Sequence, residues 1–225
     1  TRTQETVIND LQVGDALSVG GRTRYVGGNL MPNPDFDLGT LGWTNGQGQP
    51  LTDECFTVVP VGGIDGGAFL RAWSSETGMN TAGALKTFFP IQPGQDYYFS
   101  GSVCNDEVAM HRLSLTKDGS KEDSVAASFS LAPVWASQSF TFNSGDYTQA
   151  MFVCRRMNGK SLFDKFMFCA LFDSREEAIA DGVACLRRSA AVVQEHVAAH
   201  PELVDELSQV LAAVDGTDET CYTLL

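Results

Sequence analysis

Basic residues are scarce in this 225-residue chain, which has 15 lysines and arginines against 28 acids and a formal net charge of −13. Because such a charge repels phosphate backbones and anionic lipid surfaces, the composition argues against a nucleic-acid partner. The sequence also lacks an apolar run of the roughly 20 residues that span a bilayer, which argues against membrane insertion. Residues 1–9 contain no basic stretch followed by an apolar one, so no signal peptide is visible there.

Histidine is rare as well, because the first 173 residues contain only His111. Serine or cysteine nucleophiles that need a histidine base would all depend on this one residue. No strand-like run carries the paired carboxylates of a glycoside hydrolase, and no glycine-rich phosphate loop precedes a helix. We therefore interpret the chain as non-catalytic, with an enzyme as the alternative.

The six cysteines are widely spaced, and none forms the Cys-x-x-Cys pair typical of zinc sites. Cys104, Cys154 and Cys169 lie in apolar runs, where a free thiol behaves as a small hydrophobic side chain. Buried free thiols are the favoured interpretation, and disulfides are the alternative.

Aromatic residues divide the chain into unlike parts. All three tryptophans and all 14 phenylalanines lie between Asn29 and Asp173, whereas residues 174–225 contain only Tyr222. Residues 174–225 also carry 10 acids and 3 bases. We predict three segments: a β-hairpin or lead-in over residues 1–28, a β-sandwich over 29–173 and an α-helical extension over 174–225.

Short runs rich in β-branched and aromatic residues fill the central segment, with turn residues such as glycine, aspartate and asparagine between them. Around nine such runs without a helical period predict a mainly β fold, an antiparallel β-sandwich. The expected strands are residues 55–61, 68–73, 84–91, 96–104, 111–116, 124–131, 135–142, 149–155 and 163–172. Ahead of them, Gly20-Gly21 between two shorter runs predicts a hairpin.

The periodicity of apolar residues changes at Ser174. Ser174 and Glu177 have the spacing of a capping box, and apolar residues then recur every three or four positions, which predicts a helix of about 25 residues. Pro201 ends this helix and suits the first turn of a second one, which Gly216 stops. The segment is therefore predicted to form an α-helical hairpin.

Residues 29–43, Asn-Leu-Met-Pro-Asn-Pro-Asp-Phe-Asp-Leu-Gly-Thr-Leu-Gly-Trp, resemble the opening of jelly-roll carbohydrate-binding modules of families four, nine and twenty-two. The resemblance continues in order through residues 65–71, 89–100, 135–142 and 162–168, and it covers roughly residues 29–172. It implies a jelly-roll sandwich that binds a polysaccharide or other glycan. It also implies a module of a larger bacterial protein, located outside the cell, at its surface or in the periplasm.

The resemblance implies a possible structural calcium ion. Modules of this kind hold calcium with an acid near the first strand and another in the last strand, and here Asp37 and Asp164 occupy these places. Backbone carbonyls near Asn33 would supply further oxygen ligands. Lys165 follows Asp164 where such modules often have a second acid, and the alternative is that the acids pair with a nearby base. No cofactor is required.

Four residues are candidates for sugar contact. Trp73 leads from an apolar run into the polar stretch 74–78, where its ring can stack on a sugar. Tyr97 and Tyr98 are adjacent in a strand, so one is expected in the core and the other on the surface. Arg112 is a polar partner for hydroxyl groups. Two further tryptophans, Trp43 and Trp135, match positions that are buried in the modules and are expected in the core.

These features predict a non-catalytic, carbohydrate-binding-like module whose partners are a glycan and the neighbouring domains of its parent protein. The alternative is a structural, adhesive or spacer module that binds no sugar.

Overall fold

A computed structural model of the chain describes residues 11–44, 56–74, 84–105, 111–116, 122–127, 134–155 and 159–199. The chain forms two compact units. The sandwich comprises Leu30–Leu171, and the hairpin-helix unit comprises Leu11–Asn29 together with the chain from Phe172 onward.

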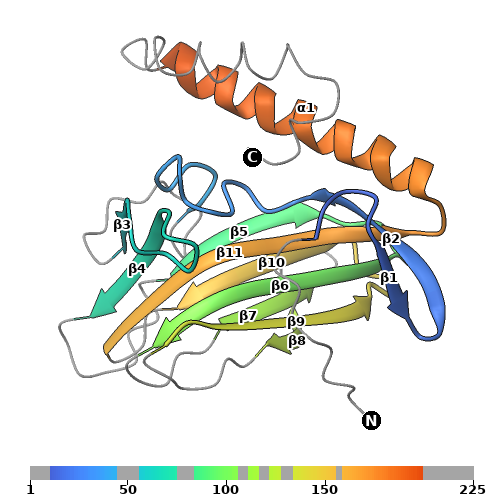
Figure 1. Ribbon diagram of the computed structural model, residues 1–225, viewed down its shortest axis with the longest axis horizontal. Coiled ribbons are helices and arrows are strands. Elements are labelled where there is room, and N and C mark those ends of the chain that lie inside the picture. Colours follow the sequence, from blue (N-terminus) through green and yellow to red (C-terminus); the bar gives the residue numbers. More distant parts are fainter. Residues whose placement is uncertain are drawn as a thin grey trace. The chain divides into compact units, whose positions relative to one another are not determined.

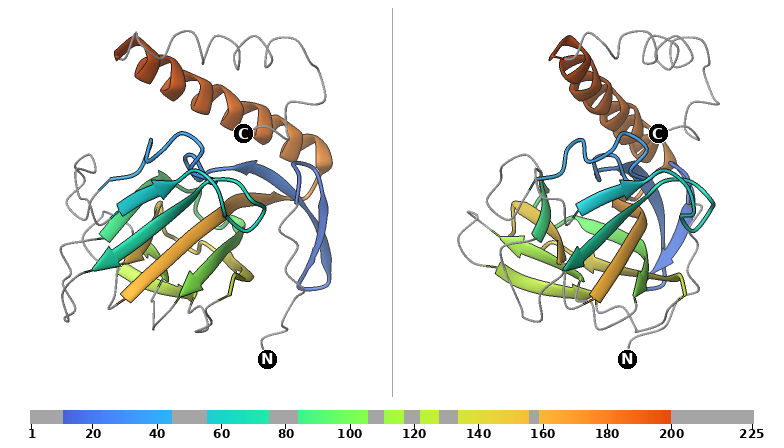
Figure 2. Two further views of the ribbon diagram at one scale, coloured as in Figure 1. Left: turned by 60° about the vertical axis from the view of Figure 1, so that its left-hand side comes forward. Right: turned by 90° about the vertical axis from the view of Figure 1, so that its left-hand side faces the viewer.

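The sandwich consists of two antiparallel sheets, which can be followed in Figure 1 and from two further sides in Figure 2. One contains β3 (Phe56–Val59), β4 (Phe69–Ser74), β11 (Gly159–Phe172), β6 (Asp96–Asn105) and β9 (Ala136–Asn143), paired in that order. The other is four-stranded, with β5 (Ala84–Pro90), β10 (Gln149–Arg155), β7 (His111–Thr116) and β8 (Glu122–Ala127) in that order. Each strand predicted between residues 55 and 172 is present to within a few residues, which confirms the antiparallel sandwich.

Aromatic rings from both sheets form the core of the sandwich. The centroid of the Phe152 ring in β10 lies 5.1 Å from that of Phe99 in β6 and 4.7 Å from that of Phe166 in β11. All three residues are fully buried. Because Phe152 belongs to one sheet and Phe99 and Phe166 to the other, their packing joins the two sheets and excludes water from between them.

Trp43 closes this core from the loop that precedes β3. Its ring is 3% exposed, stacks on Phe36 at a centroid distance of 5.3 Å, and donates a hydrogen bond from Nε1 to the Pro32 carbonyl at 3.0 Å. The expectation of a core residue is confirmed for Trp43. Trp135 is half-buried, with its ring edge-to-face against Phe69 at 5.9 Å.

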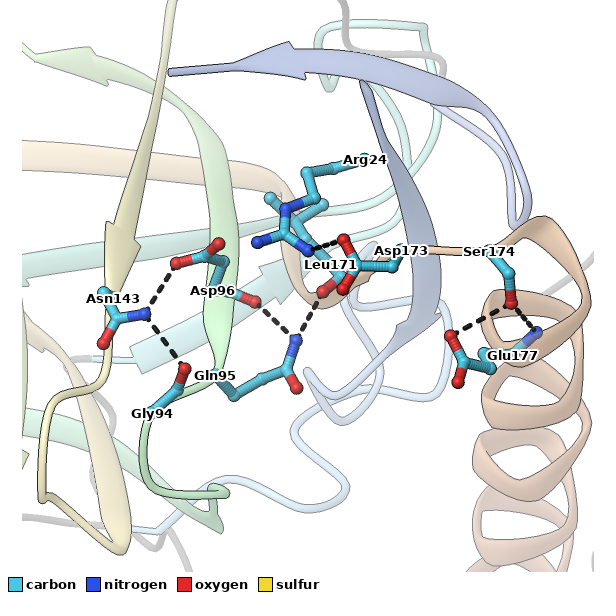
Figure 3. Close-up of polar contacts among 9 residues, drawn as sticks. All are labelled: Arg24, Gly94, Gln95, Asp96, Asn143, Leu171, Asp173, Ser174 and Glu177. Carbon is cyan, nitrogen blue, oxygen red and sulfur yellow. Dashed lines mark hydrogen bonds and ion pairs between the residues drawn. The ribbon is translucent and has the colours of Figure 1, made fainter. Parts of the chain in front are cut away.

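Polar side chains fix the turn that leads into β6 (Figure 3). Asn143 of β9 donates from Nδ2 to Asp96 Oδ1 at 2.7 Å and to the Gly94 carbonyl at 3.0 Å. Gln95 donates from Nε2 to the Leu171 carbonyl at the end of β11. Two of these bonds go to backbone carbonyls, those of Gly94 and Leu171, at the ends of the strands.

The hairpin-helix unit contains β1 (Ala16–Val19), β2 (Arg22–Asn29) and α1 (Arg175–Ala199). Gly20 and Gly21 have φ values of 58° and 79°, the left-handed conformation that a two-residue primed turn requires, so the predicted hairpin is confirmed. The sequence placed the hairpin and the helix in separate segments, whereas the structure joins them in one unit. Periodicity identifies helices and strands but not which of them pack together. It therefore could not show that the hairpin and the helix share one unit.

The N-terminus of α1 is capped as its sequence predicts. Glu177 donates its backbone N–H to Ser174 Oγ at 3.2 Å, and the Ser174 hydroxyl donates to Glu177 Oε2 at 3.0 Å (Figure 3). Just before the cap, Asp173 forms an ion pair with Arg24 of β2. The predicted second helix of the helical hairpin, from Pro201, lies outside the described residues.

Two glycines let β2 and α1 approach closely. A Cβ atom at Gly28 would lie 2.6 Å from both Cβ and Sγ of Cys185, and one at Gly182 would lie 2.6 Å from Cγ1 of Val13. Gly28 also donates its N–H to Asp181 Oδ2 at 3.0 Å. Helical glycine costs about 1 kcal/mol relative to alanine, and the space it gives Val13 accounts for its presence here.

Cys104, Cys169 and Cys185 carry thiols and form no disulfide. Cys169 and Cys185 are buried, whereas Cys104 is half-buried. Burial, followed by the nearby charge of Asp181, raises the pKa of Cys185 to about 11. This thiol is therefore protonated at neutral pH and serves as packing. No helix in the described part of the chain combines the length and the hydropathy needed to cross a membrane.

Candidate functional site

A bulge in β11 brings a lysine to a group of acids. The register between β11 and β6 shifts between Asp164 and Met167, and Lys165 within it has a φ of 54°. Bulges redirect side chains, and Lys165 Nζ lies 2.7 Å from Asp65 Oδ2 and 3.4 Å from Asp35 Oδ1. Asp35, Asp65, Asp164 and Lys165 together are the Lys165 cluster.

Asp164 is the buried member of this cluster. Its Oδ2 accepts the Ile64 N–H at 2.8 Å, and its Oδ1 accepts the Lys165 N–H, also at 2.8 Å. Gly63 leaves room for the carboxylate, because a Cβ there would lie 2.3 Å from Oδ2. Asp164 therefore ties the loop between β3 and β4 to the bulge of β11.

Burial and the lysine act in opposite directions on the pKa values of the Lys165 cluster. Burial raises the pKa of Asp164 to about 6 against two backbone hydrogen bonds, and it also raises the pKa of Asp35 against the pull of Lys165. The pKa of Asp65 is lowered, first by its hydrogen bond from Lys165 and then by the Gly67 N–H. Burial alone would lower the pKa of Lys165, but its bonds and charge interactions with Asp65 and Asp35 raise it.

These shifts predict a pH dependence of stability. The folded-state pKa of Asp164 lies above its unfolded value of 3.8. The folded state is therefore favoured over the unfolded one while the carboxyl is protonated, and this stability is lost as pH rises through about 6. We expect the free energy of unfolding to fall by about 2 kcal/mol between about pH 4.5 and 7. Asp65 shifts in the opposite direction and acts at lower pH.

Urea unfolding across this range measures the effect. Asp164→Asn is the control, because it cannot titrate and is expected to flatten the slope. A wild-type slope that the variant reproduces would show that Asp164 is not its source.

The Lys165 cluster does not fit a calcium ion as it stands. Both Asp164 oxygens already accept backbone N–H groups, and an ammonium lies among the carboxylates. Asp37 is exposed, and the described residues contain no group of three or more His, Cys, Asp or Glu side chains placed to hold a metal. Calcium at Asp37 and Asp164 stays a prediction from the family resemblance. A higher melting temperature in calcium than in EDTA would support it, and no chemistry is derived from it.

A second candidate site is the face of the four-stranded sheet that points away from the core. Phe152 and Ala150 of β10 are fully buried toward the core, so the alternate positions lie on the opposite side. Residues paired across antiparallel strands share a face. The outer face therefore comprises, by register, Lys86, Phe88 and Pro90 of β5, Gln149, Met151, Val153 and Arg155 of β10, Arg112, Ser114 and Thr116 of β7, and Glu122, Ser124 and Ala126 of β8.

An aromatic side chain is exposed on this outer face. Phe88 is 45% exposed, whereas Met151, its cross-strand partner, is 3% exposed. Ser114 of β7 and Ser124 of β8 continue the same row across the sheet. The row thus runs from an exposed ring over an apolar floor to two hydroxyl-bearing positions.

The four residues predicted for sugar contact are not brought together. Trp73 lies in β4 opposite Lys160 of β11, in the other sheet from Arg112. Tyr97 and Tyr98 are 2% and 3% exposed, so the expectation that one of them faces solvent is wrong. Tyr97 stacks on Phe168 at 5.1 Å in the core, and its hydroxyl accepts the Gln92 N–H at 2.8 Å.

Sequence reasoning placed Arg112 among the candidates but missed Phe88. The adjacent pair Phe88-Phe89 held the signal, because neighbours in a strand lie on opposite faces. The same rule misled at Tyr97-Tyr98, where both faces of β6 are buried. Alternation identifies the two faces of a strand but not whether each meets water.

No family model and no curated protein matches the chain. Similar solved structures include a family 61 carbohydrate-binding module in complex with beta-1,4-galactotriose, at 17% identity and a TM-score of 0.43, covering 62% of this chain and 97% of the module. Another is the xylan-binding family 22 module of Xyn10C from Paenibacillus barcinonensis, at 14% identity and a TM-score of 0.43, covering 58% of this chain and 86% of that one.

A third is the enzymatically active domain of tailspike protein 4 from bacteriophage CBA120, at 11% identity and a TM-score of 0.44. The match covers 63% of this chain but 21% of the tailspike domain. Jelly-roll carbohydrate-binding modules, the kind that the sequence resembles, are thus among the similar solved structures. Identities of 11% to 17% bear on the fold alone.

Proposed function

We propose that the protein is a non-catalytic carbohydrate-binding module and that the glycan lies on the outer face of the four-stranded sheet. The observation that carries the proposal is Phe88, a large apolar side chain held 45% exposed in the middle of a regular strand. At this exposure the ring is accessible to a ligand. A phenyl ring offers a flat surface to the C–H faces of a sugar.

A polar residue beside Phe88 suits a hydroxylated ligand. Gln149 of β10 is half-buried in the row next to the ring, and its amide both donates and accepts hydrogen bonds. Hydrolysis of a glycoside needs two carboxyl groups facing one bond. The described side chains of this face, Phe88, Pro90, Gln149 and Met151, carry none, which favours binding over cleavage.

Within this proposal the chain is one module of a larger secreted or cell-surface bacterial protein. The module holds the parent protein, or the domains next to the module, on a polysaccharide. The alternative is a structural or adhesive module that binds no sugar.

Phe88→Ala tests the proposed function. Because half of the ring is exposed, we expect a small change in melting temperature but an affinity for the bound polysaccharide weakened about tenfold, the loss of roughly 1.4 kcal/mol of stacking. Affinity electrophoresis through gels containing soluble polysaccharides, both neutral and acidic, measures this change. Val61→Ala, at an apolar position that is 68% exposed in the loop between β3 and β4, is the matched control.

Equal retardation of Phe88→Ala and the wild type would show that the ring is not part of the binding site. Retardation by no polysaccharide would favour the structural module.

A further inference from the structure

The bulge in β11 turns two successive residues to the same side of the strand. Phe163 and Phe166 are both fully buried in the core, with ring centroids 6.3 Å apart. In a regular strand the side chain of Lys165 would share the face of Phe163 and point into the core. The bulge instead lets both Asp164 and Lys165 reach the loop between β3 and β4. An acid and a base that are adjacent in the sequence therefore contact the same loop.

The backbone at Lys165 is held in an uncommon conformation. Its φ of 54° lies in the left-handed region, which non-glycine residues adopt where their surroundings hold them there. Two contacts do so, because the Lys165 N–H donates to Asp164 Oδ1 at 2.8 Å and Nζ lies 2.7 Å from Asp65 Oδ2. The position of the ammonium is thus built into the strand and is not that of a freely rotating surface lysine.

The ammonium joins three separate segments of the sandwich. Asp35 belongs to the loop that precedes β3, Asp65 to the loop between β3 and β4, and Lys165 to β11. The first loop also meets β11 through its backbone, because Phe166 donates its N–H to the Pro34 carbonyl at 3.3 Å. A positive charge at this point therefore cross-links two loops to the last strand of the sandwich.

Several oxygens that a calcium ion would need are already directed at N–H groups. Calcium takes about six to eight oxygen ligands. Both carboxylate oxygens of Asp164 accept backbone N–H groups. The Asn33 carbonyl accepts the Phe36 N–H at 3.2 Å, and Asn33 Oδ1 accepts the Leu38 N–H at 3.0 Å. The local backbone is thus arranged around the carboxylates and the ammonium.

We infer that the Lys165 ammonium is the structural cation of the Lys165 cluster, in the place where the family resemblance implies calcium, and that the fold requires no divalent metal. The 2.7 Å between Nζ and Asp65 Oδ2 is close to the length of a calcium–oxygen bond, about 2.3–2.6 Å. The ammonium and a calcium ion therefore cannot occupy this place together. Unlike a bound ion, the ammonium is part of the chain and cannot be removed by a chelator.

The inference predicts a metal requirement that is hidden in the wild type. Without the ammonium, Asp35 and Asp65 would face the space that it fills. Lys165→Asp would add a further carboxylate there, and aspartate is among the residues that tolerate the left-handed conformation. Because carboxylates and water are the ligands that calcium prefers, this variant is expected to bind the ion.

Melting temperatures of the full chain in calcium chloride, magnesium chloride and EDTA, at equal ionic strength, test the inference. We expect the wild type to melt at the same temperature in all three. Lys165→Asp is expected to melt below the wild type in EDTA and to gain about 5 °C or more in about 10 mM calcium chloride, because an ion bound only by the folded state stabilises it.

Two variants serve as controls. Lys165→Arg keeps a cation in the cluster and is expected to stay insensitive to calcium. Arg22→Asp makes the same change of charge as Lys165→Asp at an exposed position of the β-hairpin, and it is also expected to stay insensitive.

Three outcomes would overturn the inference. A wild type that melts higher in calcium than in EDTA would favour the calcium site that the resemblance implies. A Lys165→Asp variant that calcium does not stabilise, or that folds in neither medium, would show that a divalent ion cannot take the place of the ammonium. A calcium response of Arg22→Asp as large as that of Lys165→Asp would assign the effect to net charge.

Discussion

Replacing Trp43 by alanine is expected to lower the free energy of unfolding by about 3–5 kcal/mol, the usual cost of deleting a buried indole. The ring contacts Phe36, Phe152 and Phe166 at centroid distances of 5.3, 6.2 and 6.0 Å. Its removal leaves a cavity at the junction of the loop and both sheets, where the surrounding strands cannot collapse inward. The substitution also leaves the Pro32 carbonyl without its N–H donor. Equilibrium urea unfolding measures the loss.

Two further variants divide the effect of Trp43 into its parts. Trp43→Phe keeps an aromatic ring in the core and removes the hydrogen bond, and it is expected to cost about 1–3 kcal/mol. Trp135→Ala deletes a half-buried ring and is expected to cost less than Trp43→Ala. A loss below about 1 kcal/mol for Trp43→Ala would contradict the place of this ring in the core.

Replacing Lys165 by methionine is expected to destabilise the protein by about 1–2 kcal/mol at pH 7, between the values for exposed and buried ion pairs, because the side chains of Lys165 and Asp65 are 28% and 49% exposed. Methionine keeps the apolar stem but removes the ammonium that lies against Asp65 and Asp35. These carboxylates, with the buried Asp164 beside them, would then repel one another without a cation between them. The loss is measured as the shift in urea-unfolding free energy.

The pH dependence distinguishes this electrostatic cause from a packing defect. Protonation relieves the repulsion, so the difference between Lys165→Met and the wild type is expected to shrink as pH falls from 7 toward about 4.5. Lys165→Arg keeps the charge and is expected to recover most of the stability. A deficit that is the same at both pH values, or that arginine fails to reduce, would mean that the stem and the bulge, not the charge, determine the effect.

The strands and the first helix could be predicted from the sequence because their signals are local. Residues 96–104 alternate with a period of two and form β6, and the Ser174-Glu177 spacing marks the start of α1. The core position of Trp43 followed from the family resemblance.

The candidate site was less accessible from the sequence because it depends on register between distant strands. Phe88, Met151 and Arg112 share a face only through the pairing of β5 and β7 with β10. The surroundings of Lys165 likewise depend on the bulge that shifts the register between β11 and β6, and no residue type in the sequence predicts this bulge. Trp73, chosen for its position beside a polar stretch, belongs to the other sheet.

The order of the chain sets a sequence of events for its synthesis. The hairpin of the hairpin-helix unit precedes the sandwich and its helix follows it, so β2 leaves the ribosome before the partner that packs on Gly28 and Val13 exists. At typical translation rates the intervening residues 30–171 take about 7–28 s to synthesise. The sandwich can be completed only at the end of that interval, when β11 has been synthesised and can pair with β4 and β6, and the hairpin-helix unit must wait longer, for residues 175–185. A released chain truncated before α1 would therefore contain every strand of the sandwich but would lack the helix that packs on Gly28 and Val13.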